Sequence, residues 1–216
     1  NSQAYTYDQA LAGIAMVKEG NVTAAKRIFD FYYAEWQREA GAFSGFWTVY
    51  HVDAATQWKK FEWRKGMGEN AWMALFFLHY ADAVALSSPA EKAKALELAS
   101  VVAEWIGSLP HHAGGAAMSP DTPWANPNYG RIYSVENNLD YYALLKTLIP
   151  RTVNPARRSF FESEFASLKN WLKTGAYDAS TGLFRRGGNL DAGGAFQWDG
   201  LKSLDVNSWA VQAIGV

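Results

Sequence analysis

The feature that most constrains this chain is a long internal repeat in which polar residues lead into an apolar, small-residue helix. Four segments share the pattern: TYDQAL from Thr6, GENAWMAL from Gly68, SVENNLDYYALL from Ser134 and LDVNSWAV from Leu204. With Asp8, Asn70, Asp140 and Asn207 as anchors, the separations are 62, 70 and 67 residues. This period exceeds that of the common helical repeats, about 34–47 residues, and fits two helices plus one long loop per unit.

Between these segments the sequence predicts a second kind of helix. Apolar residues recur at helical spacing over residues 21–39, 90–109 and 154–173, with charged residues on the opposite face. The helix predicted over residues 71–86 is instead apolar nearly all round, which is typical of a helix buried on most sides. Buried inner helices that alternate with amphipathic outer helices predict an all-α fold, an α/α toroid of helical hairpins with inner-helix N-termini around one mouth.

The repeat also bears on domain organisation. The 216 residues suit one domain with a substantial core, so residues 1–216 are expected to form a single toroid domain. The fourth unit stops after about one helix, which favours an incomplete toroid, a fragment of a larger one. Short extended pieces are expected at 45–52 and 182–186. The glycine-rich segments 110–130 and 187–200 are expected to be long loops.

Composition and missing motifs exclude several classes of function. A net charge of -1 predicts neither a nucleic-acid partner nor a charged membrane surface, and no apolar run approaches the roughly 18–20 residues that span a bilayer. Without cysteine there is no disulfide or thiol chemistry. The four histidines form no HExxH pattern, and GxSxG, P-loop and GxGxxG motifs are absent, so no metal or cofactor is expected. Three glycine pairs, at 114–115, 187–188 and 193–194, are interpreted as loop flexibility.

The polar helix starts are the candidate functional residues. Capping of helix N-termini and the helix dipole explain any single one of them, but acids and amides cluster more deeply than caps require. Carboxylates that face each other across a cleft are what glycoside hydrolysis needs. Glu69 and Glu136 are the first predicted catalytic pair, and Asp205 and Asp8 the next candidates. Neighbouring polar residues predicted to bind substrate are Tyr7, Asn70, Asn137 and Asp140.

Aromatic residues are unusually frequent, with 10 Trp, 11 Tyr and 12 Phe. Aromatic rings in a cleft are a common platform for flat, amphipathic ligands such as sugars. The loop tryptophans near the helix starts are predicted to stack on sugar rings, with anchoring of loops to the core as the alternative: Trp47, Trp63, Trp124 and Trp198.

Taken together, TYDQALA, GENAWMALFFL, SVENNLDYYALL and LDVNSWAVQAI resemble secreted bacterial proteins of the six-hairpin, α/α-toroid glycosidase superfamily. The resemblance covers most of the chain and is more specific for architecture than for a reaction. It implies a carbohydrate substrate, a secreted or periplasmic location, and catalytic acids at inner-helix N-termini, which here are Glu69, Glu136 and Asp205. Oligomeric state, sugar, linkage and stereochemistry stay open.

Two other functions compete with a glycoside hydrolase. A toroid-type polysaccharide lyase would abstract a proton with Tyr or His, helped by Asn and Arg. The residues available for that reaction are Tyr7, Tyr133, His51, Asn137 and Arg131. A glycan-binding or scaffold toroid would keep the aromatic surfaces without an acid pair, and fold alone does not decide among the three.

Overall fold

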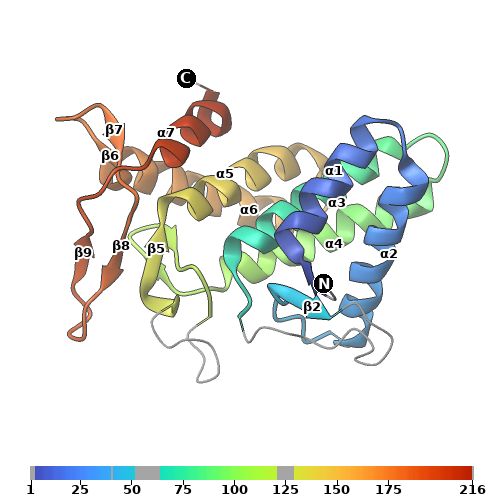
Figure 1. Ribbon diagram of the computed structural model, residues 1–216, viewed down its shortest axis with the longest axis horizontal. Coiled ribbons are helices and arrows are strands. Elements are labelled where there is room, and N and C mark those ends of the chain that lie inside the picture. Colours follow the sequence, from blue (N-terminus) through green and yellow to red (C-terminus); the bar gives the residue numbers. More distant parts are fainter. Residues whose placement is uncertain (1–2, 40, 52–63, 121–128, 216) are drawn as a thin grey trace. The chain divides into compact units, whose positions relative to one another are not determined.

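The computed structural model describes residues 3–39, 41–51, 64–120 and 129–215. The chain divides into two compact units, Asn1–Trp105 and Ile106–Val216. Helices dominate both units, and the strands are short (Figure 1). This confirms a mainly helical chain built from helical hairpins.

Unit 1 contains two such hairpins and a small two-stranded sheet. Its elements are β1 (Gln3–Tyr5), α1 (Thr6–Lys18), α2 (Val22–Arg38), β2 (Val49–His51), α3 (Met67–Ala83) and α4 (Pro89–Gly107), the last of which ends just past the unit boundary. Strands β1 and β2 are antiparallel, with Tyr5 opposite Val49. Helix α3 packs against both α1 and α2, so it forms the centre of the unit.

The core of unit 1 is aromatic, which accounts for much of the chain's ring content. Twelve of the 17 residues of α3 are buried, as its apolar sequence predicts. Phe29 of α2 stacks on Tyr80 of α3 at 4.8 Å between ring centroids. Helix α1 approaches α3 closely because Gly13 carries no Cβ; an added Cβ would lie 2.5 Å from the Phe76 ring. Many of the rings therefore serve packing rather than a ligand.

Unit 2 repeats the hairpin plan and adds more β-structure. Its helices are α5 (Val135–Leu148), α6 (Pro155–Trp171) and α7 (Leu204–Ala210), with a 3-10 turn η1 (Tyr129–Arg131), a 3-10 turn η2 (Ile149–Arg151) and π-helical turns η3 (Leu172–Ala176) and η4 (Val211–Gly215). Its strands are β3 (His111–His112), β4 (Gly115–Ala116), β5 (Ile132–Ser134), β6 (Tyr177–Asp178), β7 (Leu183–Phe184), β8 (Gly187–Leu190) and β9 (Phe196–Trp198). Strands β5, β8 and β9 form one antiparallel sheet with β8 in the middle.

The amphipathic segments fold as predicted, into α2, α4 and α6. The inner helix predicted over residues 71–86 begins earlier, at Met67, so its polar start belongs to the first helical turn. The extended pieces predicted at 45–52 and 182–186 contain β2 and β7. The predicted loop at 187–200 is instead the β8–β9 hairpin, drawn in red in Figure 1.

The structure corrects the interpretation of two glycine pairs as loop flexibility, because both are sites of close packing. An added Cβ on Gly115 would lie 2.5 Å from the Trp171 ring, and one on Gly114 would lie 2.6 Å from the Ser167 carbonyl oxygen. In β8, a Cβ on Gly188 would lie 2.6 Å from the Gln197 carbonyl oxygen. The third pair, at 193–194, does lie in a turn with open space around Gly194.

Two absences hold for the part of the chain that the structure describes. No helix there is long and apolar enough to cross a membrane. Those same residues contain no group of three or more His, Cys, Asp or Glu side chains placed to hold a metal ion.

Candidate functional site

An asparagine in the first turn of α3 holds the preceding loop in place. Asn70 accepts a hydrogen bond from the Phe46 backbone N–H at 2.7 Å and donates to the Phe46 carbonyl at 3.0 Å. It also donates to the Gly66 carbonyl at 2.8 Å. The side chain is fully buried, and both of its amide hydrogens are used. This arrangement assigns Asn70 to the fold rather than to ligand binding.

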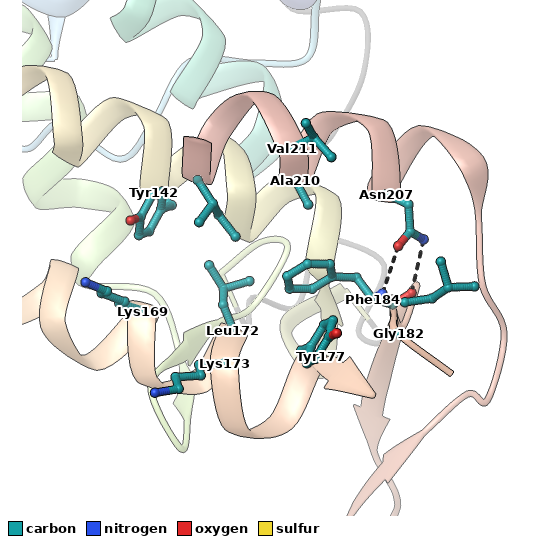
Figure 2. A pocket seen from close by; sticks show the side chains of 12 residues that line it. Tyr142, Lys169, Leu172, Lys173, Tyr177, Gly182, Phe184, Asn207, Ala210 and Val211 are labelled. Atoms are coloured by element: carbon teal, nitrogen blue, oxygen red, sulfur yellow. Dashed lines mark hydrogen bonds between the residues drawn. The ribbon is translucent and has the colours of Figure 1, made fainter. Parts of the chain in front are cut away.

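The same three hydrogen bonds recur twice in unit 2. Asn138 of α5 exchanges two bonds with the Ala116 backbone, at 2.8 and 2.9 Å, and donates to the Ser134 carbonyl at 2.7 Å. Asn207 of α7 exchanges two with the Phe184 backbone, at 2.8 and 3.3 Å, and donates to the Ser203 carbonyl at 2.8 Å. We call Asn70, Asn138 and Asn207 the amide clamps. They satisfy backbone N–H and C=O groups of the segment that each helix start packs against: a loop at Phe46, strand β4 at Ala116 and strand β7 at Phe184 (Figure 2).

The clamps correct the register of the repeat. Each is the fourth residue of its helix, so the spacings between residues 70, 138 and 207 are 68 and 69. Asp140, the anchor chosen from sequence, lies two residues further along α5 and is buried. In the corrected register, Glu136 and Asp205 are both second residues of their helices, whereas Glu69 is a third residue. One residue turns a helix by about 100°, so Glu69 is not the equivalent of Glu136.

In unit 1, the Glu69 carboxylate is held by its neighbours. Its Oε1 lies 3.3 Å from Arg64 Nη2 and accepts from the Thr48 hydroxyl at 3.4 Å. The carboxylate also lies against Gly66, where an added Cβ would be 1.9 Å from Oε2. Tyr7 and Asp8, at the start of α1, are exposed, and Tyr7 packs edge-on against Trp72 at 5.9 Å. These contacts give Glu69 a structural partner in its own unit.

In unit 2, the structure brings Glu136 and Asp205 within electrostatic reach. Desolvation by surrounding protein atoms, and then the negative charge of Asp205, raise the pKa of the exposed Glu136 carboxyl above its ordinary value. The pKa of Asp205 is lowered, first by the nearby Ser203 hydroxyl and then by the Val206 backbone N–H, which donates to Oδ1 at 2.9 Å. Two interacting carboxyls with opposite shifts are typical of an acid and base pair.

Beside Glu136 lies a cavity of ≈ 790 Å³ whose lining is polar and apolar in nearly equal parts. Its walls come from η1, β5, the start of α5 and the β8–β9 hairpin. The charged and amide side chains that line it are Arg131, Glu136, Asn137, Arg186, Asn189, Asp191 and Asp199. Within this set, Arg186 Nε lies 2.9 Å from Asp199 Oδ2. Such a cavity can hold a polar ligand next to a carboxyl whose pKa is raised.

Not all of the residues predicted to bind substrate lie at this cavity. Asn137 lines this cavity, whereas Asp140 is buried in unit 2. The Trp198 ring is contacted by Trp171 at 5.4 Å and by Arg185 at 5.4 Å. Lys65 lies over the half-buried Trp47 ring at 4.5 Å. Both rings have protein partners, which favours the anchoring alternative for them.

Some predictions cannot be placed. Trp63 and Trp124 lie outside the described residues. Glu69, Tyr7 and Asp8 are in unit 1 and Glu136 and Asp205 in unit 2, so the pair Glu69–Glu136 stays a prediction. Of the residues named for a lyase, Arg131 and Asn137 line the cavity, and Tyr133 is fully buried.

The sequence did not single out the cavity residues on the β8–β9 hairpin, Arg186, Asn189, Asp191 and Asp199. The signal that could have found them is the pair Gly187–Gly188, because adjacent glycines inside a run of extended residues often mark close backbone approach in a sheet.

Comparisons with known proteins support the fold. The sequence matches no protein-family model and no curated protein. The structure is similar to a crystal structure described as "a possible member of GH105 family" from Salmonella enterica subsp. enterica serovar Paratyphi A, with a TM-score of 0.65 and 9% sequence identity. The match covers 99% of this chain and 56% of that one, so the chain spans little more than half the length of that protein. At this identity the likeness shows a shared fold.

Proposed function

We propose that this protein is a carbohydrate-active hydrolase, with Glu136 as the general acid and Asp205 as its partner carboxylate. One observation carries the proposal: two residues at the same repeat position interact, and their carboxyl pKa values are shifted in opposite directions. The structurally similar Salmonella protein is described as a possible member of a glycoside hydrolase family, which supports the same class of reaction.

The shifts match the roles that hydrolysis requires. A glycosidic oxygen leaves readily only when it is protonated, so one carboxyl must hold a proton until the bond breaks. The raised pKa suits Glu136 to that role. The second carboxyl must be ionised so that it can activate water or attack the sugar carbon, and the lowered pKa suits Asp205 to it.

The neighbouring cavity supplies room and polar partners for a sugar. Its volume of ≈ 790 Å³ lies in the range of about 300–1,000 Å³ that is usual for ligand pockets. Asn137 and Asn189 offer amide donors and acceptors for hydroxyl groups, and Arg131 offers several N–H donors. We further infer that the helical hairpins form part of an α/α toroid, as predicted. We also infer the secreted or periplasmic location that the sequence resemblance implies.

Mutation of the pair tests the proposal. Reducing-sugar release from a panel of plant and bacterial polysaccharides identifies a substrate for the wild-type chain. Glu136→Gln and Asp205→Asn should then each lower turnover by about 10²–10⁴ while substrate binding is retained. The matched control is Glu162→Gln, at an exposed position on α6. Wild-type turnover in both site variants would remove the pair from the mechanism.

A polysaccharide lyase is the second candidate, because Arg131 and Asn137 line the same cavity. A lyase makes a new carbon–carbon double bond, so its products absorb in the ultraviolet, whereas those of a hydrolase do not. Absorbing products that persist in Glu136→Gln would identify the lyase. Glycan binding without any product would identify the scaffold alternative.

A further inference from the structure

A histidine on strand β3 of unit 2 has a hydrogen-bond acceptor at each of its two ring nitrogens. His111 Nδ1 lies 2.7 Å from the Leu109 carbonyl oxygen, and Nε2 lies 3.2 Å from Glu164 Oε2 of α6. A carbonyl oxygen and an ionised carboxylate accept hydrogen bonds and have no hydrogen to donate. A neutral imidazole carries one N–H and an imidazolium carries two, so only the protonated ring makes both bonds at once.

The carboxylate that faces His111 is held from a second side by α5. The Tyr141 hydroxyl donates to Glu164 Oε2 at 3.4 Å, and the tyrosine is only 1% exposed. The side chains of His111 and Glu164 are themselves 28% and 19% exposed, so water and salt screen this pair less than a fully exposed one. Tyr141 therefore keeps the carboxylate oxygen in place beside the imidazole ring.

The surroundings of the ring favour its charged form. The hydrogen bond with Glu164 is the largest cause that raises the pKa of His111 above its ordinary value; desolvation opposes it, and the charge of Glu164 and the Leu109 carbonyl add to it. The residue opposite His111 in β4 is Ala116, which does not titrate, and the next residue of β3, His112, stacks on Phe196 at 4.6 Å. Glu164 is thus the charged group that acts on this ring.

The contact ties a hairpin to a helix. His111 belongs to β3, which pairs with β4, and the glycine pair between them packs closely against α6. The same hairpin supplies Ala116, whose backbone exchanges two hydrogen bonds with the clamp Asn138 in the first turn of α5. The ion pair between His111 and Glu164 therefore joins α6 to the segment that holds the start of α5.

We propose that His111 and Glu164 form a pH-sensitive clasp, closed while His111 is an imidazolium and broken at one of its two ends when the ring loses its proton. One remaining N–H cannot serve two acceptors, and the attraction between opposite charges disappears. Because the folded-state pKa is raised, the stabilisation is fully present below the unfolded-state pKa of about 6.5 and is lost as the pH rises through the folded-state pKa. The clasp is independent of the proposed hydrolase activity, since none of its residues lines the cavity beside Glu136.

A double-mutant cycle at two pH values tests the clasp. His111→Ala, Glu164→Ala and the double variant are compared with the wild type by urea denaturation at about pH 5.5 and at about pH 9. At the lower pH the two side chains should be coupled by about fivefold in the unfolding equilibrium constant, and at the higher pH by less than about twofold. Within one cycle, the effects of other titrating groups and of the Tyr141 hydroxyl that loses its acceptor cancel.

Matched variants separate the clasp from simple packing. Glu162→Ala, at an exposed position on the same helix, should show no coupling to His111→Ala at either pH. Glu164→Gln removes the charge, keeps the size of the side chain and replaces Glu164→Ala if that variant does not fold. In an NMR titration of the four imidazoles, the pKa of His111 should be lower in Glu164→Gln than in the wild type, and His111→Ala assigns its signal.

Three results would overturn the proposal. Equal coupling at both pH values would show that the contact does not depend on the proton. Coupling below about twofold at both pH values would show that the two side chains stabilise the fold independently. A His111 titration that Glu164→Gln leaves unchanged would show that the carboxylate does not hold the proton.

Discussion

The start of α3 in unit 1 and the start of α5 in unit 2 are built alike and differ in chemistry. In both, an asparagine at the fourth helical position holds the preceding loop through three hydrogen bonds. The carboxylates beside them differ. Glu69 is bound to Arg64 and Thr48, whereas Glu136 lines a cavity and is within electrostatic reach of Asp205. The fold depends on the asparagine at the fourth position of the helix. The proposed chemistry depends on the acid at the second position, which is Glu136 in α5 and Asp205 in α7.

This contrast separates two roles that look the same in sequence. An acid next to an amide at a helix start satisfies the pattern of a cap, a clamp or a catalytic group equally well. The groups that the side chain contacts in the folded protein decide among these three roles. A carboxylate beside a cation forms an ion pair, whereas the carboxyl of Glu136, near the charge of Asp205, has a raised pKa.

Removal of the amide clamps should lower the free energy of unfolding more than the other changes proposed below. A different response in the two units would contradict the view that α3 and α5 begin in the same way. Asn70→Ala and Asn138→Ala each remove three hydrogen bonds to backbone groups in a buried site, so the free energy of unfolding should fall by about 3–5 kcal/mol. Asn207 is only half-buried, and Asn207→Ala should cost about 1–2 kcal/mol. Urea denaturation measures all three, with Asn137→Ala as the control, expected within about 0.5 kcal/mol of wild type. A change as small as the control's in Asn138→Ala would show that the clamp is dispensable.

Substitution of the glycines that pack against tryptophan rings should lower the free energy of unfolding by a smaller amount. Gly45→Ala and Gly115→Ala each place a Cβ 2.5 Å from an indole ring, and the overpacking should lower the free energy of unfolding by about 1–3 kcal/mol. Gly45 also has φ +90°, so its variant should be the more destabilised of the two. Thermal melts rank the two variants by stability. Gly20→Ala, at φ +76° with no neighbour within 4 Å, measures the backbone cost alone, and equality with Gly45→Ala would exclude the packing cost.

The smallest expected effect is a change in the pKa of Glu136, which tests whether Glu136 and Asp205 are coupled. Asp205→Asn removes the negative charge that helps to raise the pKa of Glu136, so that pKa should fall toward its ordinary value. A carbon-13 NMR titration of the glutamate side chains follows it without an activity assay. The matched control is Asp191→Asn, which also neutralises an acid of unit 2. An unchanged Glu136 titration in Asp205→Asn, or an equal change in the control, would contradict a specific coupling of the pair.

Several elements could be predicted because their signals are local. The helical spacing of apolar residues located α2, α4 and α6, and the uninterrupted apolar run identified α3 as buried. A further local signal was missed: Trp36, Trp105 and Trp171 all lie near the ends of outer helices, 69 and 66 residues apart. That spacing, close to that of the clamps, would have fixed the register from the sequence.

The sequence by itself determined the helical hairpins, their approximate repeat and the polar residues at each inner-helix start, because these follow from periodicity over adjacent residues. Only the tertiary structure decided which asparagines hold loops and which carboxylates interact. A hydrogen bond between residues 22 to 24 positions apart, or a charge effect between Glu136 and Asp205, depends on where the backbone brings the groups together. Proton affinity and cavity shape are set by that surrounding structure, so a helix start acquires its chemistry only once the chain has folded around it.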